Sequence, residues 1–176
     1  DSSHIALLGH SMGAGAALDF ATRDAGIDAV VLISGGWSML GPQRAPNALF
    51  LYAVGDPERI RTRTGELTAR LAGIAQPALA QTYGDFRQGT AVRRVEVPGA
   101  DHLTILWSDF ALSEIVAWLD AAFGREQRAA PVNPDPRGPV VALLGVLMVL
   151  VLPGLGLLIG RLTPTTEHLP ASRRPL

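Results

Sequence analysis

The stretch His4–Leu18, HIALLGHSMGAGAAL, decides how this chain is expected to fold. Its first half is a short apolar run, typical of a strand buried on both faces of a parallel sheet. The run enters Gly9-His10-Ser11-Met12-Gly13, and the alanine-rich segment 12–23 that follows is typical of a helix. The pattern predicts a sharp strand-to-helix turn that exposes the hydroxyl of Ser11. Glycine is expected to be required at positions 9 and 13, because strand and helix pass so close to each other there.

Three further segments are typical of strands, and segments with helical spacing lie between or after them. The expected strands are 28–34, 48–54 and 91–97, and the expected helices are 58–74 and 108–123, the last with Ser108 as its cap. Residues 77–90 are expected to be irregular. Strands that alternate with helices predict an α/β fold, in which a parallel sheet carries helices on both faces.

A second kind of segment explains the positive mean hydropathy of +0.24. Residues Val140 to Gly160 contain no charged side chain and are bounded by Arg137 and Arg161. A helix needs about 20 such residues to cross the hydrocarbon core of a bilayer. The segment therefore predicts a transmembrane helix and a membrane location. Pro153 is compatible with this, since proline is tolerated in membrane spans.

The expected organisation follows from these two kinds of segment. Residues 1–123 form the α/β domain, 124–138 a proline-rich linker, 139–161 the transmembrane helix and 162–176 a polar tail. Arginines flank both ends of the apolar run, so the side of the membrane that carries the domain is left open. A chain with further spans outside these residues is an alternative organisation.

Composition excludes several classes of function. The 176 residues carry a formal net charge of -1, so no electrostatic basis for nucleic-acid binding exists. The chain has no cysteine, which excludes thiol nucleophiles and disulfides. Gly9, Gly13 and Gly15 do not have the spacing of a dinucleotide-binding loop, and no clustered ligands suggest a metal. No cofactor and no metal are therefore expected.

A serine needs a base before it can act as a nucleophile, and His102 is the best candidate. It follows the strand 91–97 in the loop VPGADHLTIL, at the same edge of the sheet as Ser11. His4 begins a strand and His168 lies in the tail. The side chain of His10, next to the serine, is expected to point away from the site.

The acid that would orient this histidine is expected after the strand 48–54. Gly55-Asp56-Pro57-Glu58 reaches the same edge between the serine and the histidine in chain order. Asp56 is preferred and Glu58 is the alternative, although an aspartate before a helix also serves as an ordinary cap. Asp101 is expected to point elsewhere if His102 points inward. The backbone N–H of Met12, at the start of the helix, would help to bind an oxyanion.

The order Ser…Asp…His, with each residue at the end of a successive strand, resembles the α/β-hydrolase superfamily. The resemblance covers about residues 4–123 and depends mainly on the GHSMG turn. It implies that Ser11 is the nucleophile, His102 the general base, Asp56 the orienting acid and Met12 an oxyanion donor. The expected function is a membrane-anchored serine hydrolase that cleaves an ester or related acyl bond in a small-molecule or lipid-like substrate, with residues 140–160 in the membrane.

The chain also departs from that family. Members have about four strands before the serine turn, and a loop among them supplies the second oxyanion donor. We therefore expect these residues to be the C-terminal part of a longer protein and to have little activity alone. A catalytically degenerate domain that serves as a membrane-tethered binding or scaffold module is the alternative function.

Overall fold

The computed structural model describes residues 4–36, 44–126 and 137–162, which fall into two separate units, 1–135 and 136–176. The strands of the first unit are β1 (Ala6–His10), β2 (Ala29–Ile33), β3 (Ala48–Ala53), β4 (Thr82–Tyr83) and β5 (Val92–Val97). Its helices are α1 (Met12–Ala21), α2 (Glu58–Ala72), the 3-10 turn η1 (Thr104–Trp107) and α3 (Asp109–Ala122). The second unit contains α4 (Arg137–Leu162). Residues 127–136 of the predicted linker 124–138 and residues 163–176 of the predicted tail, which include His168, lie outside the described residues.

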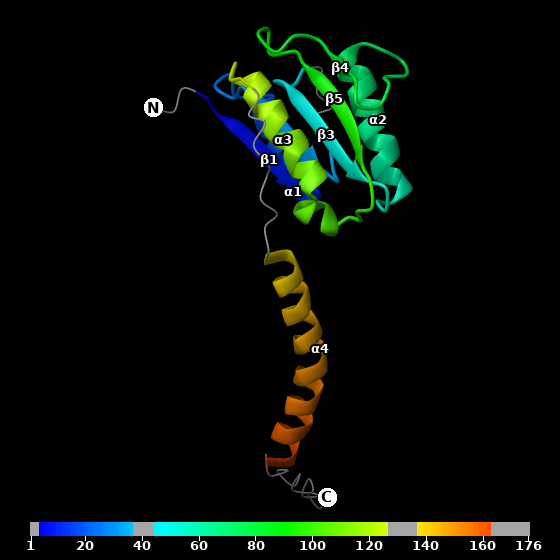
Figure 1. Ribbon diagram of the computed structural model, residues 1–176, viewed down its shortest axis with the longest axis vertical. Helices are drawn as coiled ribbons and strands as arrows, with labels where there is room; N and C mark the ends of the chain where they lie inside the picture. The colour runs from blue at the N-terminus through cyan, green and yellow to red at the C-terminus, as the bar shows by residue number, and fades with distance from the viewer. Residues whose placement is uncertain (1–3, 37–43, 127–136, 163–176) are drawn as a thin grey trace, which may run out of the picture. The chain divides into compact units, whose positions relative to one another are not determined.

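The first unit is an α/β fold with a mostly parallel five-stranded sheet, as the sequence predicts. The strand order is β1-β2-β3-β5-β4 (Figure 1). Strands β1, β2, β3 and β5 are parallel to one another. Their carboxyl ends therefore meet at one edge of the sheet. The two-residue strand β4 pairs antiparallel with β5 and was not expected, because its segment shows no apolar alternation.

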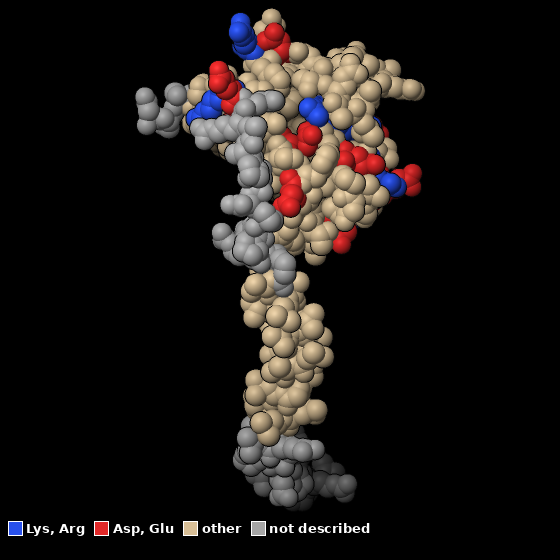
Figure 2. Space-filling view, in the orientation of Figure 1, with Lys and Arg blue, Asp and Glu red and all other residues tan. Residues whose placement is uncertain are grey.

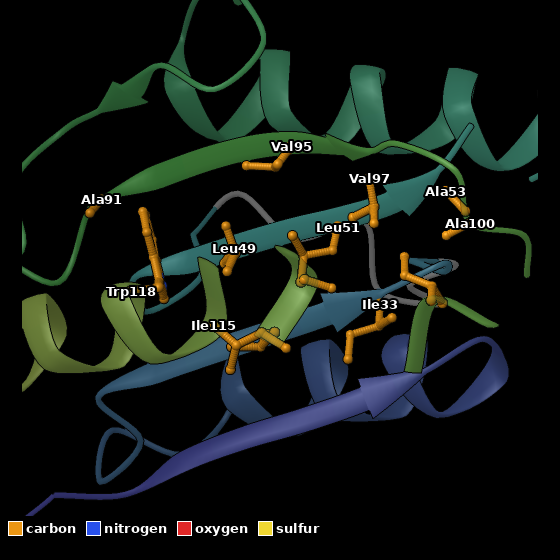
Figure 3. Packing of buried hydrophobic residues seen from close by; sticks show 13 residues of the cluster. Ile33, Leu49, Leu51, Ala53, Ala91, Val95, Val97, Ala100, Ile115 and Trp118 are labelled. Atoms are coloured by element: carbon orange, nitrogen blue, oxygen red, sulfur yellow. The ribbon is translucent and has the colours of Figure 1, made fainter. Parts of the chain in front are cut away.

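Alternate side chains of the central strands point into two separate cores. Every residue of β2 and β3 is buried, which explains why these segments read as continuous apolar runs. Val31, Ile33, Leu49 and Leu51 pack against α3, around Ile115 and Trp118 (Figure 3). On the other face, Val30, Leu32 and Phe50 pack against Leu18 of α1 and Leu67 of α2. Helices thus cover both faces, and the core fixes the positions of the strand ends.

Helix α3 begins where the sequence predicts. The side chain of Ser108 accepts a hydrogen bond from the N–H of Ala111, which is the expected cap. Trp118 lies on the buried face of the helix, whereas Leu112 is exposed. The indole N–H of Trp118 donates to the carbonyl of Asn47 at 2.8 Å, so the packing of this face also ties α3 to the start of β3.

The described residues of the second unit, 137–162, form one apolar helix. Helix α4 runs without interruption through Pro153, and Val140–Gly160 comprises 21 residues with a mean hydropathy of 2.7, none of it buried. Between Val140 and Gly160 the helix carries no charged side chain (Figure 2). At 1.5 Å per residue the segment is about 32 Å long, close to the thickness of a bilayer's hydrocarbon core. The helix is therefore long and apolar enough to cross a membrane.

Candidate active site

Ser11 occupies a strained turn between β1 and α1. Its backbone dihedrals are φ 54° and ψ -118°, a region that residues with a side chain rarely adopt. Such a conformation costs about 1–3 kcal/mol and persists only where the surroundings enforce it. Here the N–H of Ser11 donates to the carbonyl of Ile33 at 2.8 Å, and its own carbonyl accepts from Ala14 at 3.1 Å. The turn is thus tied both to the neighbouring strand and to the helix that follows.

Close backbone packing explains one of the two flanking glycines and a third that the sequence did not reveal. A Cβ at Gly9 would lie 2.2 Å from the carbonyl oxygen of Gly13, and a Cβ at Gly35 would lie 2.2 Å from that of Ser11. A Cβ at Gly13 would meet no atom within 4 Å. Close packing therefore requires glycine at positions 9 and 35. The expectation that position 13 also requires glycine is wrong, since no described atom lies near enough to exclude a side chain there.

The structure brings Ser11, His102 and Asp56 together, although they are far apart in the sequence. The distance from Nε2 of His102 to Oγ of Ser11 is 2.9 Å, and that from Nδ1 of His102 to Oδ1 of Asp56 is 2.7 Å. A carboxylate accepts, so Nδ1 carries the proton and Nε2 is left free to accept the proton of the serine hydroxyl. The three side chains form one hydrogen-bonded series from carboxylate to hydroxyl.

Asp56 is buried, and three donors surround its carboxylate. Besides His102, the hydroxyl of Ser34 donates to Oδ2 at 2.6 Å and the N–H of Ala53 donates to the same oxygen at 2.7 Å. A buried carboxylate is costly unless such donors satisfy it. Glu58, the alternative acid, is exposed in the first turn of α2. In this geometry Asp56, and not Glu58, contacts the histidine.

Ser34 is a residue of the site that sequence reasoning missed. It lies at the end of β2, is fully buried and has a positive φ of 47°. A serine that ends an apolar strand before Gly35-Gly36 reads as ordinary turn chemistry. The one signal available was its position, since β2 ends at the same sheet edge as the strands that carry Ser11 and Asp56.

Asp101, which precedes the histidine, points away from the site as expected. Its Oδ1 accepts hydrogen bonds from the N–H groups of Leu103 and Thr104 at 2.9 and 2.8 Å. Hydrogen bonds from Thr104 and then Leu103 hold the pKa of Asp101 below its usual value of 3.8. Asp101 therefore caps η1 and shapes the loop that presents His102.

His10 does not point away from the site, so the expectation for this residue is wrong. Its Nε2 lies 2.7 Å from the backbone carbonyl oxygen of His102, and the two imidazole rings are 5.0 Å apart. His10 pairs with Ile33 of β2, which lies in the core on the α3 face of the sheet together with Ile105, so the side chain of His10 lies on the face that the loop carrying His102 approaches. His4 stacks on Phe123 and contacts Asp28, at the start of β2 and away from the serine.

Met12 is the first residue of α1, so its backbone N–H lies at the open end of that helix. The first N–H groups of a helix have no intrahelical acceptor and carry partial positive charge. The N–H of Ala14 is already bonded to the carbonyl of Ser11, which leaves those of Met12 and Gly13 at this end. The position is suited to an anion beside the serine hydroxyl.

A cavity of about 600 Å³ lies at the opposite edge of the sheet. Asp28, Asn47 and Gly89, which precede β2, β3 and β5, are among the residues that line it. It is therefore separate from the group formed by Ser11 and its partners. No set of three or more His, Asp or Glu side chains within 4–36, 44–126 and 137–162 is placed to hold a metal ion.

Comparisons with protein-family models, curated proteins and solved structures found no significant match to this chain. Function is therefore argued from the geometry of the site. A hydroxyl that contacts the free nitrogen of an imidazole, whose other nitrogen contacts a buried carboxylate, can transfer its proton to that imidazole when it attacks an electrophile.

Proposed function

We propose that this chain contains a serine hydrolase domain of the α/β-hydrolase type, held at a membrane by α4. The single observation that carries the proposal is the series of two contacts, 2.9 Å from Ser11 to His102 and 2.7 Å from His102 to Asp56. The serine lies on a strained strand-to-helix turn. The parallel strands bring the acid and the histidine to the same edge of the sheet, and the three residues follow one another along the chain as Ser, Asp and His.

The reaction begins when Oγ of Ser11 attacks the carbonyl carbon of an ester or related acyl group. The hydroxyl proton passes to Nε2 of His102, while Asp56 stabilises the imidazolium through Nδ1. The tetrahedral oxyanion is bound by backbone N–H groups, among them that of Met12. The leaving alcohol then takes the proton from Nε2, and the acyl group stays on the serine.

Water completes the cycle. His102 removes a proton from the water as it attacks the acyl carbon, and the second tetrahedral intermediate collapses to release the carboxylic acid product. The proton returns from Nε2 to Oγ of Ser11. The chain's own groups supply every proton transfer, so the proposed reaction requires no cofactor.

The apolar helix supports the membrane part of the proposal. Val140–Gly160 has the length and hydropathy of a span, and nothing in the described residues buries it. An anchored catalyst is suited to small-molecule or lipid-like esters that partition into the bilayer, and this is the substrate class that we propose.

A fluorophosphonate probe tests the catalytic proposal, because it phosphonylates only an activated serine. The protein expressed from its full reading frame is incubated with the probe, together with Ser11→Ala and Ser113→Ala. Ser113 is an exposed serine of α3 whose hydroxyl donates to the Phe110 carbonyl, so it serves as the matched control. Labelling that is lost only in Ser11→Ala supports the hydrolase.

The same experiment addresses the alternative of a degenerate, membrane-tethered binding module. A folded protein that takes up no probe at Ser11 and hydrolyses no acyl ester would overturn the enzymatic proposal in favour of that alternative. Labelling that persists in Ser11→Ala would place the reactive serine elsewhere.

A further inference from the structure

The histidine has to reach the serine across two intervening strands. His102 follows β5, whereas Ser11 follows β1, and β2 and β3 lie between them. At about 4.8 Å per strand, the ends of β1 and β5 are about 14 Å apart. The loop after β5 must therefore run back along the sheet edge, and something has to hold its far end against the serine turn.

Two hydrogen bonds to backbone carbonyls hold this loop along its path. The N–H of Gly55, just after β3, donates to the carbonyl of Ala100 at 3.0 Å. A Cβ at Gly55 would lie 3.0 Å from the same oxygen, so the loop passes close over the end of this strand. At the far end, Nε2 of His10 lies 2.7 Å from the carbonyl oxygen of His102 itself.

The acceptor fixes the role of the His10 ring. A carbonyl oxygen can only accept, so Nε2 of His10 must carry a proton and donate it. The Nε2–H tautomer of the neutral ring and the imidazolium both meet this requirement. Two adjacent residues thus contact His102: His10 bonds to its backbone carbonyl, and Ser11 contacts its imidazole ring.

We propose that His10 is a positioning residue, which fixes the backbone of His102 so that its Nε2 stays in contact with the hydroxyl of Ser11. As a statement about catalysis, this inference rests on the proposed hydrolase function. Without the His10 bond, the contacts that the described residues still provide at this end of the 98–103 loop are the Gly55–Ala100 bond and the ring contacts of His102 with Asp56 and Ser11, and the contact with Ser11 has to break and re-form during turnover.

Catalysis is sensitive to such a loss, because a displacement of about 1 Å in a reacting group can reduce the rate about 100-fold. We expect His10→Phe, which keeps a ring but has no donor, to lower kcat and the rate of fluorophosphonate labelling about 10- to 100-fold while KM changes by less than about threefold. His10→Gln, whose side-chain amide can donate from a similar position, is expected to restore most of the rate.

Amide hydrogen exchange tests the same bond without any catalysis. In His10→Phe, exchange over residues 99–105 is expected to accelerate at least tenfold, with β2 and β3 unchanged, and in His10→Gln it is expected to stay near the wild-type rate. If phenylalanine also reduces protection in β2 and β3, the sheet itself is perturbed and His10→Ala replaces it in the same comparison.

The two proposals fail in different ways. Wild-type exchange over 99–105 in His10→Phe, or equal rates of labelling in His10→Phe and wild type, would overturn the role of His10 even if Ser11 is the nucleophile. A wild-type protein that is never labelled at Ser11 would overturn the hydrolase, and the exchange experiment would then decide whether His10 holds the loop.

Discussion

Oδ1 of Asp56 contacts Nδ1 of His102 at 2.7 Å, while Glu58, two residues later, is exposed to solvent. The difference arises at the end of β3. Asp56 is held by the N–H of Ala53 inside a tight turn, whereas Glu58 already belongs to the first turn of α2. The carboxylate that the sequence favours and its alternative therefore have different surroundings.

This difference predicts the outcome of exchanging each acid for its amide. Asp56→Asn is expected to lower the rate of labelling at Ser11 about 10³- to 10⁴-fold, because the amide favours the wrong tautomer of His102 and cannot stabilise its charged form. Glu58→Gln is the control and is expected to stay close to wild type. Time courses of fluorophosphonate uptake measure both, and a large loss in Glu58→Gln would contradict the assignment.

Removing the donor of Ser34 is expected to cost stability as well as activity. Its hydroxyl donates to the buried carboxylate of Asp56 at 2.6 Å, and Ser34→Ala leaves that oxygen with one donor fewer. A hydrogen bond to a charged group contributes about 1.5–3 kcal/mol to the free energy of unfolding. Thermal unfolding in detergent, followed by circular dichroism, measures the loss. Ser113→Ala, at an exposed position, should change stability by less than about 0.5 kcal/mol.

The two glycines that flank the serine are expected to respond in opposite ways to alanine. In Gly9→Ala the new methyl would collide with the backbone of Gly13, which cannot move aside, and a destabilisation of about 1–3 kcal/mol is expected. In Gly13→Ala the methyl meets no neighbour, and higher helix propensity should stabilise the protein by up to about 1 kcal/mol. Equal losses in both variants would show that the packing around this turn differs from the one described.

The capping carboxylate of Asp101 predicts a pH dependence. Its pKa is lower in the folded protein than its usual value of 3.8, so the unfolded chain binds its proton first as the pH falls. Its stabilising effect is therefore fully present above about pH 4 and is lost as the pH falls through the lower, folded pKa. The difference in melting temperature between wild type and Asp101→Ala should be present at neutral pH and vanish in strong acid. A difference that grows in acid would have the wrong sign.

Charges in the middle of α4 test the proposed anchor. Leu147→Arg combined with Leu150→Arg places two guanidinium groups near the centre of the segment, at about 2.5–3.5 kcal/mol each. The variant is expected to leave the membrane fraction on alkaline carbonate extraction. Val140→Arg, at the end of the segment, is the control, since its side chain can extend to the interface. A double variant that still pellets with membranes would show that α4 is not what holds the protein there.

The strands, and the placement of Ser11, Asp56 and His102 at one edge of the sheet, could be predicted because both depend on local sequence patterns. β2 and β3 are buried on both faces and therefore appear as continuous apolar runs, and a residue after a parallel strand lies at a known edge. That reasoning was sufficient to name Ser11, Asp56 and His102, which the structure brings into contact.

The remaining features depend on distances that no local pattern contains. Ser34 looks like a turn residue until the path of β2 beside β3 is known. The contact of His10 with the carbonyl of His102 depends on the path of the 98–103 loop, and only the approach of strand to helix separates Gly9 from Gly13. β4 is two residues long, too short for a period of two to be visible.

The parallel alignment of β1, β2, β3 and β5 has a consequence for how this chain can diversify. Each group of the site is attached where a strand ends, and backbone bonds at Ser11 and Gly55 keep those ends in place. The excursion through α2 and β4, between Asp56 and β5, contributes Leu67 to the core, but the hydrogen bonds that join Ser11, His102, Asp56 and Ser34 come from the strand ends and the 98–103 loop. Insertions at the exposed residues 73–76 of that excursion would therefore change the surface of the domain while the three side chains keep their separation.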